Sequence, residues 1–589
     1  MSEEWITGGG ASGPGWGGGD EAAGMPGIRV GPRARARLLA DEGVRVLLVG
    51  DFVLEHGQER ALLRAAAEGR WAELTYLPGS YWVVADRGGR RFVCGDLSGF
   101  RSVFHAGHRP GTVWSTGARR LADHCSAAPD LAMVAARLAA GPEHWPHRTV
   151  YDRIQAVPAG SGLLLGGGAG PELVDISGIE PTLTLAQGAP AFGQALEQAV
   201  HGRMRAANGP VGADVSGGLD SSAVAILAAQ VGEVRAVTYA DDFTSSEDLS
   251  FARRAAAHMC VDLHVGQGGP GELPFGWSRE QPVTDQPAAV SLTTAQHALY
   301  LRPVAGLPLH LTGHGGDVVL DSCSAAWIGM VQRGERKEAR RQVTNWARAR
   351  NRAPRELWRA VTRAAGTGHA GALQEAASRV ARGEVEARRP GVWSWCHVGA
   401  CATWLTPSGR EQVAALLSAA AGQTREESRA DLVEQETSLR LVGADARDTV
   451  ALTAPWRVRQ VHPYLDNQVV RAAFAITPVE RHGVNSFKPL LSTALPSLPA
   501  WLTSRQTKGS FTRQLTAGMV HHQRELAQLI ATSPLVTDGP LDPTLALEAL
   551  ADIGGHHAPA LYDLQRLVMA CQWLAICRHN GIAGLEPAC

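Results

Sequence analysis

Residues 216–222, with the sequence SGGLDSS, combine side chains that bind phosphate with one that binds a cation. They follow a short apolar run and precede a predicted helix, whose N-terminus would offer unpaired N–H groups and a positive dipole end. Gly217 and Gly218 let a ligand approach the backbone closely, and the serines add hydroxyl donors. Asp220 would repel phosphate unless a cation lay between them, so we expect it to bind Mg²⁺. The pattern differs from G-x4-G-K-[ST] of a Walker A loop.

The segments around this loop predict an α/β fold with a parallel sheet, because short apolar strands alternate with helical patterns. Beyond residue 324 the pattern is almost entirely helical. The expected strands are 212–215, 235–240, 262–265 and 308–313, and the expected helices are 192–207, 223–230 and 248–259.

The N-terminal third has a different character. Residues 1–27 are acidic and rich in glycine, which predicts a flexible tail. The following segment to about residue 185 contains short β-like runs separated by turn residues, which predicts an antiparallel α+β domain. These runs are 44–50, 79–86, 90–96, 112–116 and 161–165.

The composition excludes several classes of protein. The chain has 589 residues with 56 basic and 57 acidic side chains, and this balance argues against a nucleic-acid-binding protein. No apolar run is long enough to span a membrane, and the N-terminus lacks the features of a signal peptide. Nine cysteines lack the spacing of zinc ligands, so we expect reduced thiols and a cytoplasmic location.

One stretch, residues 333–363, is strongly basic, with eleven Arg or Lys and three Asp or Glu. Trp346 and Trp358 are interleaved with these charges. The stretch could hold an acidic peptide or a nucleic acid, or it could be a solvated helical face, which is the more common meaning of a charge run.

Together with the loop at 216–222, several stretches resemble the asparagine-synthetase-like family of PP-loop ATP pyrophosphatases. Residues 311–317 (LTGHGGD) are similar to a second family loop, and residues 244–265 to the helix and strand that follow the first. Residues 462–473 (HPYLDNQVVRAA) match the start of a family helix, where Asp466 is expected to be an N-cap. The resemblance implies that ATP is cleaved to AMP and pyrophosphate, with ATP and Mg²⁺ as cofactors, and that a carboxylate is activated as an acyl-adenylate for attack by an amine.

The same resemblance assigns roles to individual residues. Asp317 would be the second Mg²⁺ ligand beside Asp220. The residues expected at the nucleotide are Val215, Ser216, Gly217, Gly218, Asp220, Ser221, Ser222, Val237 and Gly313.

Three residues are expected to be catalytic, and two of them are lysines. Only Lys337, Lys488 and Lys508 interrupt a chain that otherwise uses Arg for every cation. Lys488 and Lys508 lie at family lysine positions, where a compact ammonium on a flexible stem is needed beside an anionic intermediate. Lys337 falls among arginines and is expected to be ordinary. The third candidate is His314, which could take a proton from the amine or could merely pack or bind phosphate.

The N-terminal domain, residues 28–185, resembles the class II (Ntn-type) glutamine amidotransferase domain that precedes the synthetase in this family, through residues 79–105 and 154–165. Those domains use an N-terminal Cys as nucleophile. Here residue 2 is Ser, and the first cysteine, Cys94, lies within a predicted strand. A flexible tail could not hold residue 2 in a pocket. We therefore expect the glutaminase to be absent, so that the amine comes from the acyl acceptor itself.

Two relatives without glutaminase fit this expectation, the lasso peptide macrolactam synthetases (lasso cyclases) and the β-lactam synthetases. His314 replaces the Tyr of β-lactam synthetases, and a helical insertion at 324–430 within the synthetase domain (186–589) would suit a peptide substrate. These features favour the lasso cyclase, which acts on a ribosomally made precursor peptide with a leader-binding protein and a leader peptidase. The alternatives are a β-lactam synthetase-like ligase, a glutamine-independent asparagine-synthetase-like ligase and a non-catalytic peptide-binding scaffold. The set Asp220, Asp317 and Lys508 counts against the scaffold.

Overall fold

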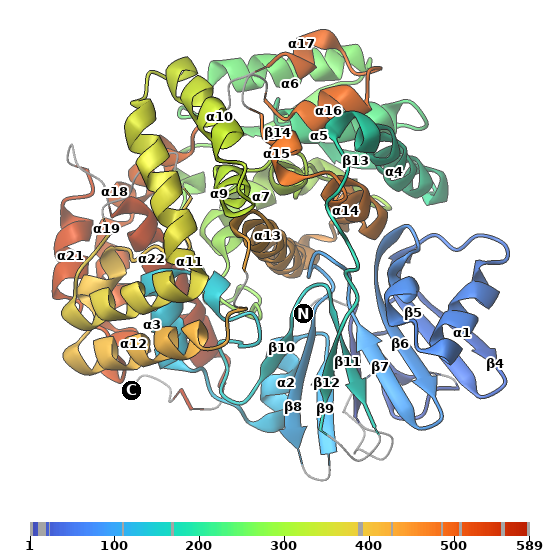
Figure 1. Cartoon of the computed structure of the whole chain (residues 1–589), viewed down its shortest axis with the longest axis horizontal. Helices are drawn as coiled ribbons and strands as arrows, with labels where there is room; N and C mark the ends of the chain where they lie inside the picture. Colours follow the sequence, from blue (N-terminus) through green and yellow to red (C-terminus); the bar gives the residue numbers. More distant parts are fainter. Residues whose placement is uncertain are drawn as a thin grey trace.

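A computed structural model gives the fold of most of the chain. It combines two antiparallel sheets near the N-terminus, a parallel sheet in the middle and a mainly helical remainder (Figure 1), which confirms the predicted fold class. The residues described are 4–9, 19–22, 24–108, 111–166, 170–386, 393–425, 428–483, 487–505, 509–554, 560–582 and 584–585.

The N-terminal domain contains two antiparallel sheets, each with six strands among the described residues. The first has the order β10-β8-β9-β1-β3-β2 and the second β12-β11-β7-β6-β5-β4. The strands of the first sheet are β1 (Ile6–Gly9), β2 (Asp20–Glu21), β3 (Ile28–Val30), β8 (Val103–His108), β9 (Gly111–Ser115) and β10 (Gln155–Val157). Those of the second are β4 (Ala36–Asp41), β5 (Val44–Phe52), β6 (Gly79–Arg87), β7 (Arg90–Cys94), β11 (Ser161–Leu165) and β12 (Glu172–Asp175), and the helices are α1 (Gln58–Glu68), α2 (Ala118–Cys125) and α3 (Leu131–Ala140).

Side-chain alternation along β5 explains how the second sheet packs against the first sheet on one face and against α1 on the other. Leu47 and Val49 pack with residues of the first sheet, whereas Val46 and Leu48 point to the opposite face, toward α1. Successive side chains of a strand point to opposite faces, so this one strand contributes to two apolar cores.

The prediction that residues 1–27 form a flexible tail is wrong for β1. This strand is buried and pairs antiparallel with β3 and β9. A Cβ on Gly8 would lie 2.6 Å from the ring of Trp114, so glycine is required here for close packing. A glycine-rich composition is typical of a linker. Here, however, Gly8 makes room for Trp114 on the paired strand β9.

The central sheet has the order β15-β14-β13-β16-β17, and all its pairs are parallel, as predicted. Its first helix, α4, begins with a capping box in which the Thr184 N–H donates to Gln187 over 2.9 Å. The strands are β13 (Val211–Asp214), β14 (Val234–Ala240), β15 (Leu263–Gln267), β16 (His310–Leu311) and β17 (Gln460–Val461). The helices are α4 (Leu185–Ala206), α5 (Leu219–Ala229), α6 (Ser246–His258), α7 (Thr294–Leu301) and α8 (Gly316–Val319).

The predicted insertion at 324–430 contains four described helices, α9 (Ala325–Gln332), α10 (Arg336–Ala349), α11 (Pro354–Arg382) and α12 (Pro407–Ala421). The remaining helices are α13 (Ala430–Thr453), α14 (Asn467–Phe474), α15 (Pro478–Arg481), α16 (Pro489–Ala494), α17 (Ala500–Thr503), α18 (Thr512–His521), α19 (Gln523–Ala531), α20 (Pro534–Thr537), α21 (Thr544–Ala551) and α22 (Leu561–His579). None of the helices in the described part of the chain has the length and apolar character to cross a membrane.

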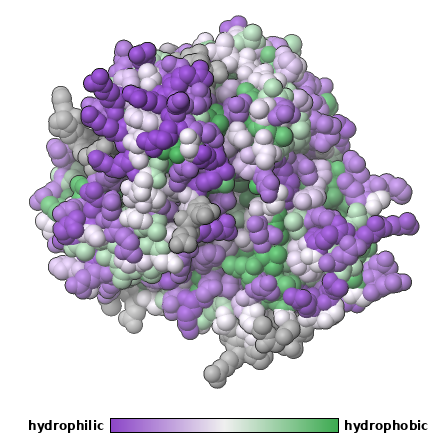
Figure 2. Space-filling model, in the orientation of Figure 1, coloured by the Kyte–Doolittle hydropathy of each residue, from purple (hydrophilic) through white to green (hydrophobic). Residues whose placement is uncertain are grey.

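The basic stretch 333–363 spans α10 and the start of α11. Trp346 and Trp358 pack against the apolar core beneath these helices, and Trp346 lies edge-on to Trp327 with centroids 5.6 Å apart. The charged side chains point outward, and Figure 2 shows hydrophilic side chains gathered where Figure 1 places α10 and α11. The interleaved tryptophans thus serve the core and leave a charged, solvated face.

Candidate functional site

The loop predicted to bind phosphate connects β13 to α5. Gly217 adopts φ +81, and a Cβ there would overlap the carbonyl oxygen of Asp248, so the position requires glycine. Ser216 and Ser221 face each other with hydroxyl oxygens 2.8 Å apart. Gly218 is the N-cap of α5 and has no side chain to occupy the first N–H groups of the helix. The loop therefore leads into a helix N-terminus that is open to an anion.

A second glycine-rich loop, between β16 and α8, packs directly onto the first. A Cβ on Gly313 would overlap the backbone nitrogen of Ser221, and one on Gly316 would lie 2.6 Å from the Asp220 carboxyl carbon. Both glycines are needed for this approach. The contact brings the two predicted metal ligands, Asp220 and Asp317, to the same place from loops 97 residues apart in the sequence.

Lys488 lies between these two carboxylates. Its ammonium donates to Asp220 Oδ1 over 2.6 Å and to Asp317 Oδ1 over 2.7 Å. The side chain of Lys488 is 2% exposed, that of Asp220 14% and that of Asp317 60%. Burial acts to lower the pKa of Lys488, but the two carboxylates raise it above the ordinary value for lysine. The ammonium is therefore charged and holds the two loops together.

The local backbone explains how Lys488 reaches this position. It is the N-cap of α16 and adopts the left-handed conformation, with φ 48, while Pro489 occupies the first turn of the helix. Proline suits the first turn because it has no N–H to satisfy. Tyr464 closes the other side and donates its hydroxyl to the Asp220 carbonyl oxygen over 3.3 Å.

Lys508 lies outside the described residues, but its neighbours in the chain do not. The Arg505 guanidinium donates to the Gly217 carbonyl oxygen and pairs with the Asp248 carboxylate. A Cβ on Gly509 would overlap the same carboxylate of Asp248. The chain therefore meets the first residues of α6, beside the phosphate loop, on both sides of 506–508. The sequence did not single out Arg505 or Asp248, although Arg505 stands only three positions before Lys508.

Three residues expected at the nucleotide lie below the surface of the site. Val215 and Val237 are fully buried, and the Val215 N–H donates to the Val237 carbonyl oxygen over 2.9 Å. Ser222 is also fully buried, and its Oγ has no hydrogen-bond partner among the described residues. These side chains support the loop from beneath, whereas Ser216 and Ser221 line its inner side.

His314 turns toward helix α13. Its Nε2 lies 3.0 Å from the Val442 carbonyl oxygen and 3.5 Å from Asp445 Oδ2. Its ring centroid is 5.4 Å from that of His462, whose Nδ1 hydrogen-bonds Thr312 Oγ1 at 2.7 Å. Burial lowers the pKa of His462 well below its ordinary value, and the neighbouring His314 adds to this shift. The pair is oriented by fixed polar contacts beside the second loop.

Asp466 is an N-cap, as predicted. Its Oδ1 accepts from the Gln468 N–H over 3.0 Å at the start of α14. The same carboxylate accepts from Arg203 of α4 over 3.2 Å. The residue therefore ties two helices together, and its role is structural.

A helix N-terminus that is open to an anion, beside two carboxylates and a lysine at the end of a parallel sheet, is an arrangement suited to a nucleotide-dependent enzyme. The asparagine synthase family model matches residues 191–575. The chain belongs to the asparagine synthase family, and ATP use with amide formation follows at the level of that family.

Among solved structures, the chain shows a likeness to glutamine phosphoribosylpyrophosphate amidotransferase from B. subtilis, in complex with ADP and GMP. The identity is 11% and the TM-score 0.17, with 50% of this chain and 59% of that chain covered. The chain thus spans less than two thirds of that protein, and a likeness this low does not bear on function. No curated protein matches the chain.

Proposed function

We propose that this protein closes a macrolactam ring in a ribosomally made precursor peptide, as the lasso cyclases do. The observation that carries its ligase chemistry is the meeting of Asp220 and Asp317 at Lys488, beside the N-terminus of α5. A side-chain carboxylate of the peptide would be activated there, and the N-terminal amine of the same peptide would attack it to form an isopeptide bond.

The donor set of this site fits Mg²⁺. Asp220 and Asp317 offer carboxylate oxygens, which Mg²⁺ prefers, and Mg²⁺ usually takes one or two carboxylates with phosphate and water as its other ligands. No group of three or more His, Cys, Asp or Glu that could hold a metal ion occurs among the described residues. When bound, Mg²⁺ would neutralise charge on the ATP phosphates. Asp220 and Asp317 would hold it.

The reaction balances with ATP as the only co-substrate. The peptide carboxylate oxygen attacks the α-phosphorus of ATP, and pyrophosphate leaves. The amine then attacks the acyl carbon, AMP leaves with the C–O electron pair, and the amine loses a proton. The first N–H groups of α5 would bind the phosphates, and Lys488 and Lys508 would stabilise negative charge as it develops. His314, oriented by Val442 and Asp445, is the proposed acceptor of the amine proton.

The state of the cysteines supports an amine that comes from the substrate. Residues 28–185 contain two cysteines, Cys94 and Cys125. Cys94 is fully buried, Cys125 is partly buried, and burial raises the pKa of both thiols. A nucleophilic cysteine needs a lowered pKa and access to the substrate. Neither thiol fits a glutaminase, and ring closure within one peptide needs no ammonia.

Further partners belong to the same proposal. A leader-binding protein and a leader peptidase would deliver the peptide and free its N-terminal amine, in the cytoplasm. The structure of the ATP site serves a glutamine-independent asparagine-type ligase equally well, so the test must separate the two acceptors.

Purified protein with ATP and Mg²⁺ is incubated with candidate precursor peptides, or with aspartate and ammonia. We expect pyrophosphate release with a peptide only, and a peptide product that has lost one water. Asp220→Ala should abolish both, whereas Asp262→Ala, at an exposed position after α6, should not. Asparagine formation would replace the peptide proposal, and no ATP cleavage with any substrate would refute a ligase.

A further inference from the structure

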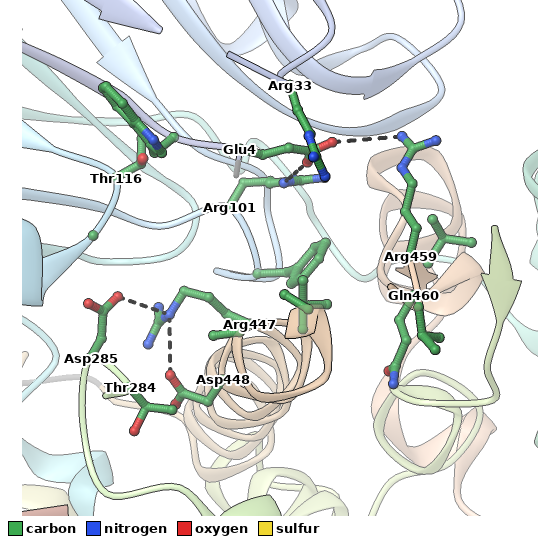
Figure 3. A pocket seen from close by; sticks show the side chains of 18 of the residues that line it. Glu4, Arg33, Arg101, Thr116, Thr284, Asp285, Arg447, Asp448, Arg459 and Gln460 are labelled. Atoms are coloured by element: carbon green, nitrogen blue, oxygen red, sulfur yellow. Dashed lines mark hydrogen bonds and ion pairs between the residues drawn. The ribbon is translucent and has the colours of Figure 1, made fainter. Parts of the chain in front are cut away.

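A cavity of about 580 Å³ lies between the N-terminal domain and the parallel-sheet part of the chain. Glu4, Arg33 and Arg101 line it from the N-terminal domain (Figure 3). Asp285, Arg447 and Arg459 line it from the other side. Its volume is in the range of a ligand-binding pocket. The site described above does not include any of these residues.

The wall of this cavity is strongly basic. Among the described residues, eight arginines and three carboxylates line it. Glu4 accepts from Arg101 over 2.8 Å and lies 3.8 Å from Arg459. Asp285 lies 3.4 Å from Arg447. Three carboxylates cannot balance eight guanidinium groups, so the cavity keeps an excess of positive charge in a chain whose net charge is −1.

The third carboxylate adds little negative charge. Burial raises the pKa of Asp448 to about 8, so this group is mostly protonated at neutral pH. Arginine is also the cation best suited to binding a carboxylate ligand, because its planar guanidinium can donate two parallel hydrogen bonds to it.

Aromatic rings give the cavity flat apolar walls. The guanidinium of Arg101 lies 4.6 Å from the ring centroid of Trp82 and 4.7 Å from that of Phe100. The guanidinium of Arg120 lies 4.0 Å from that of Trp5. Such stacking holds the arginines in place and leaves room for the apolar parts of a chain. A peptide can offer carboxylates to the arginines and apolar side chains to these rings, whereas a polyphosphate offers charge alone.

The cavity also lies next to the proposed ATP site. Phe100, which lines it, packs edge-on to His462 with centroids 5.1 Å apart. His462 in turn contacts Thr312 and His314 of the second glycine-rich loop. A chain bound in the cavity would therefore lie one side-chain layer from the predicted site of chemistry.

We propose that this arginine-lined cavity binds an acidic segment of the peptide substrate through its carboxylates. The inference rests on the proposed peptide substrate. It adds a binding site separate from the phosphate loop, where the N-terminal domain contributes directly to substrate recognition.

The test is binding of a labelled oligoglutamate, with an oligoglutamine of equal length as control, followed by fluorescence anisotropy. No ATP is present, so the result does not depend on ring closure. The oligoglutamate should bind, the oligoglutamine should not, and binding should weaken with salt. Arg33→Gln combined with Arg459→Gln should weaken binding at least about tenfold, because hydrogen bonds between charged groups are lost on both walls.

Two further variants keep the test decisive if this double variant is unstable. Glu4→Gln removes a competing carboxylate and should strengthen oligoglutamate binding. Arg64→Gln, at an exposed arginine of α1 outside the cavity, should leave it unchanged. Equal weakening by Arg64→Gln, or no response to Glu4→Gln, would overturn the inference. Displacement by inorganic phosphate as effective as by unlabelled oligoglutamate would overturn the peptide assignment in favour of a phosphate ligand.

Discussion

The ammonium of Lys488 lies 2.6 Å from a carboxylate oxygen of Asp220, although 268 positions separate the two residues in the chain. Two carboxylates held close together would repel each other and would be driven toward protonation. Lys488 offsets this repulsion, because it also reaches Asp317 and is itself almost fully buried. This lysine therefore holds both proposed Mg²⁺ ligands in place.

Replacing Lys488 by Met should lower the rate of pyrophosphate release at least about a hundredfold, because a cation beside the phosphates is lost. It should also lower the free energy of unfolding by about 3 kcal/mol, since breaking a buried ion pair leaves the Asp220 charge uncompensated. Pyrophosphate release and thermal unfolding measure the two effects. Lys337→Met, at an exposed lysine of α10, is the matched control and should change neither. Full activity of Lys488→Met would contradict the role assigned to this lysine.

The contact between the two loops gives a second prediction, made with Gly316→Ala. The added Cβ would lie 2.6 Å from the Asp220 carboxyl carbon and would push the two proposed metal ligands apart. We expect weaker Mg²⁺-dependent ATP turnover, by about tenfold or more, because misplaced groups lose catalysis steeply. Steady-state pyrophosphate release at varied Mg²⁺ measures it.

Gly366→Ala serves as the control for this substitution. Gly366 lies within α11, and a Cβ there meets no atom within 4 Å. Alanine should leave activity unchanged and raise stability slightly, because glycine is a poor helix former. If both variants behaved alike, close packing of the loops would not be the cause.

The sequence predicts the residues of the candidate site better than it predicts the side-chain contacts that position them. The first glycine-rich loop and Asp220 were expected from phosphate and cation chemistry, whereas the second loop, Asp317 and Lys488 were expected from the family resemblance. The role of Arg505 was missed, because an ion pair with Asp248, 257 positions away in the chain, leaves no local pattern. His462 was missed in the same way, since it follows β17, which joins the sheet far along the chain, and contacts Thr312 of the second loop.

The fold shows a similar division. Strands β5, β6, β7, β9 and β11, and β13 to β16 of the parallel sheet, follow from alternation and spacing, which act locally. Strands β8, β10 and β17 were not expected. The strand β1 was missed because its glycines carry no strand signal, and only the partner residue Trp114 explains them. In the basic stretch, Trp346 lies on the face of α10 that packs against the core. The many charged neighbours in the sequence make this apolar face hard to recognise.

The outward face of α10 gives a third prediction. Arg340, Arg341 and Arg348 are exposed, and Arg341 already pairs with Glu338 at 2.7 Å. Replacing all three by Gln should change the affinity for a precursor peptide by less than about twofold, because exposed charges are screened by water and salt. Fluorescence anisotropy with the peptide measures it. A loss of affinity comparable to that of the cavity variants would make this face a docking surface.

A fourth prediction concerns pH. Burial raises the pKa of Asp448 to about 8, whereas an unfolded Asp titrates near about 3.9. Between these values the folded protein binds a proton that the unfolded chain does not. The contribution of this group to stability is therefore present at acid pH, falls as pH rises and levels off above about 8.

Asp448→Asn removes this titration while keeping a similar shape. The melting temperature of the variant should exceed that of the wild type increasingly from pH 5.5 to 8.5. The exposed Asp262→Asn should follow the wild type at every pH. A constant difference between Asp448→Asn and the wild type over this range would show that Asp448 does not titrate there.

The last prediction concerns Lys508, which the family resemblance assigns to catalysis. Arg505 and Gly509 both lie against Asp248 at the start of α6, and Arg505 also binds the Gly217 carbonyl oxygen. The described residues on both sides of 506–508 therefore lie beside the phosphate loop. Lys508→Arg keeps the charge but replaces a compact ammonium by a broad planar group, so we expect ring closure to fall by about a hundredfold or more. Lys337→Arg should have no effect. The measurement is product formation in a single turnover, together with the rate of ATP cleavage. Normal ring closure by Lys508→Arg would show that any cation suffices at this position, and the scarcity of lysine in the chain would then say nothing about its chemistry.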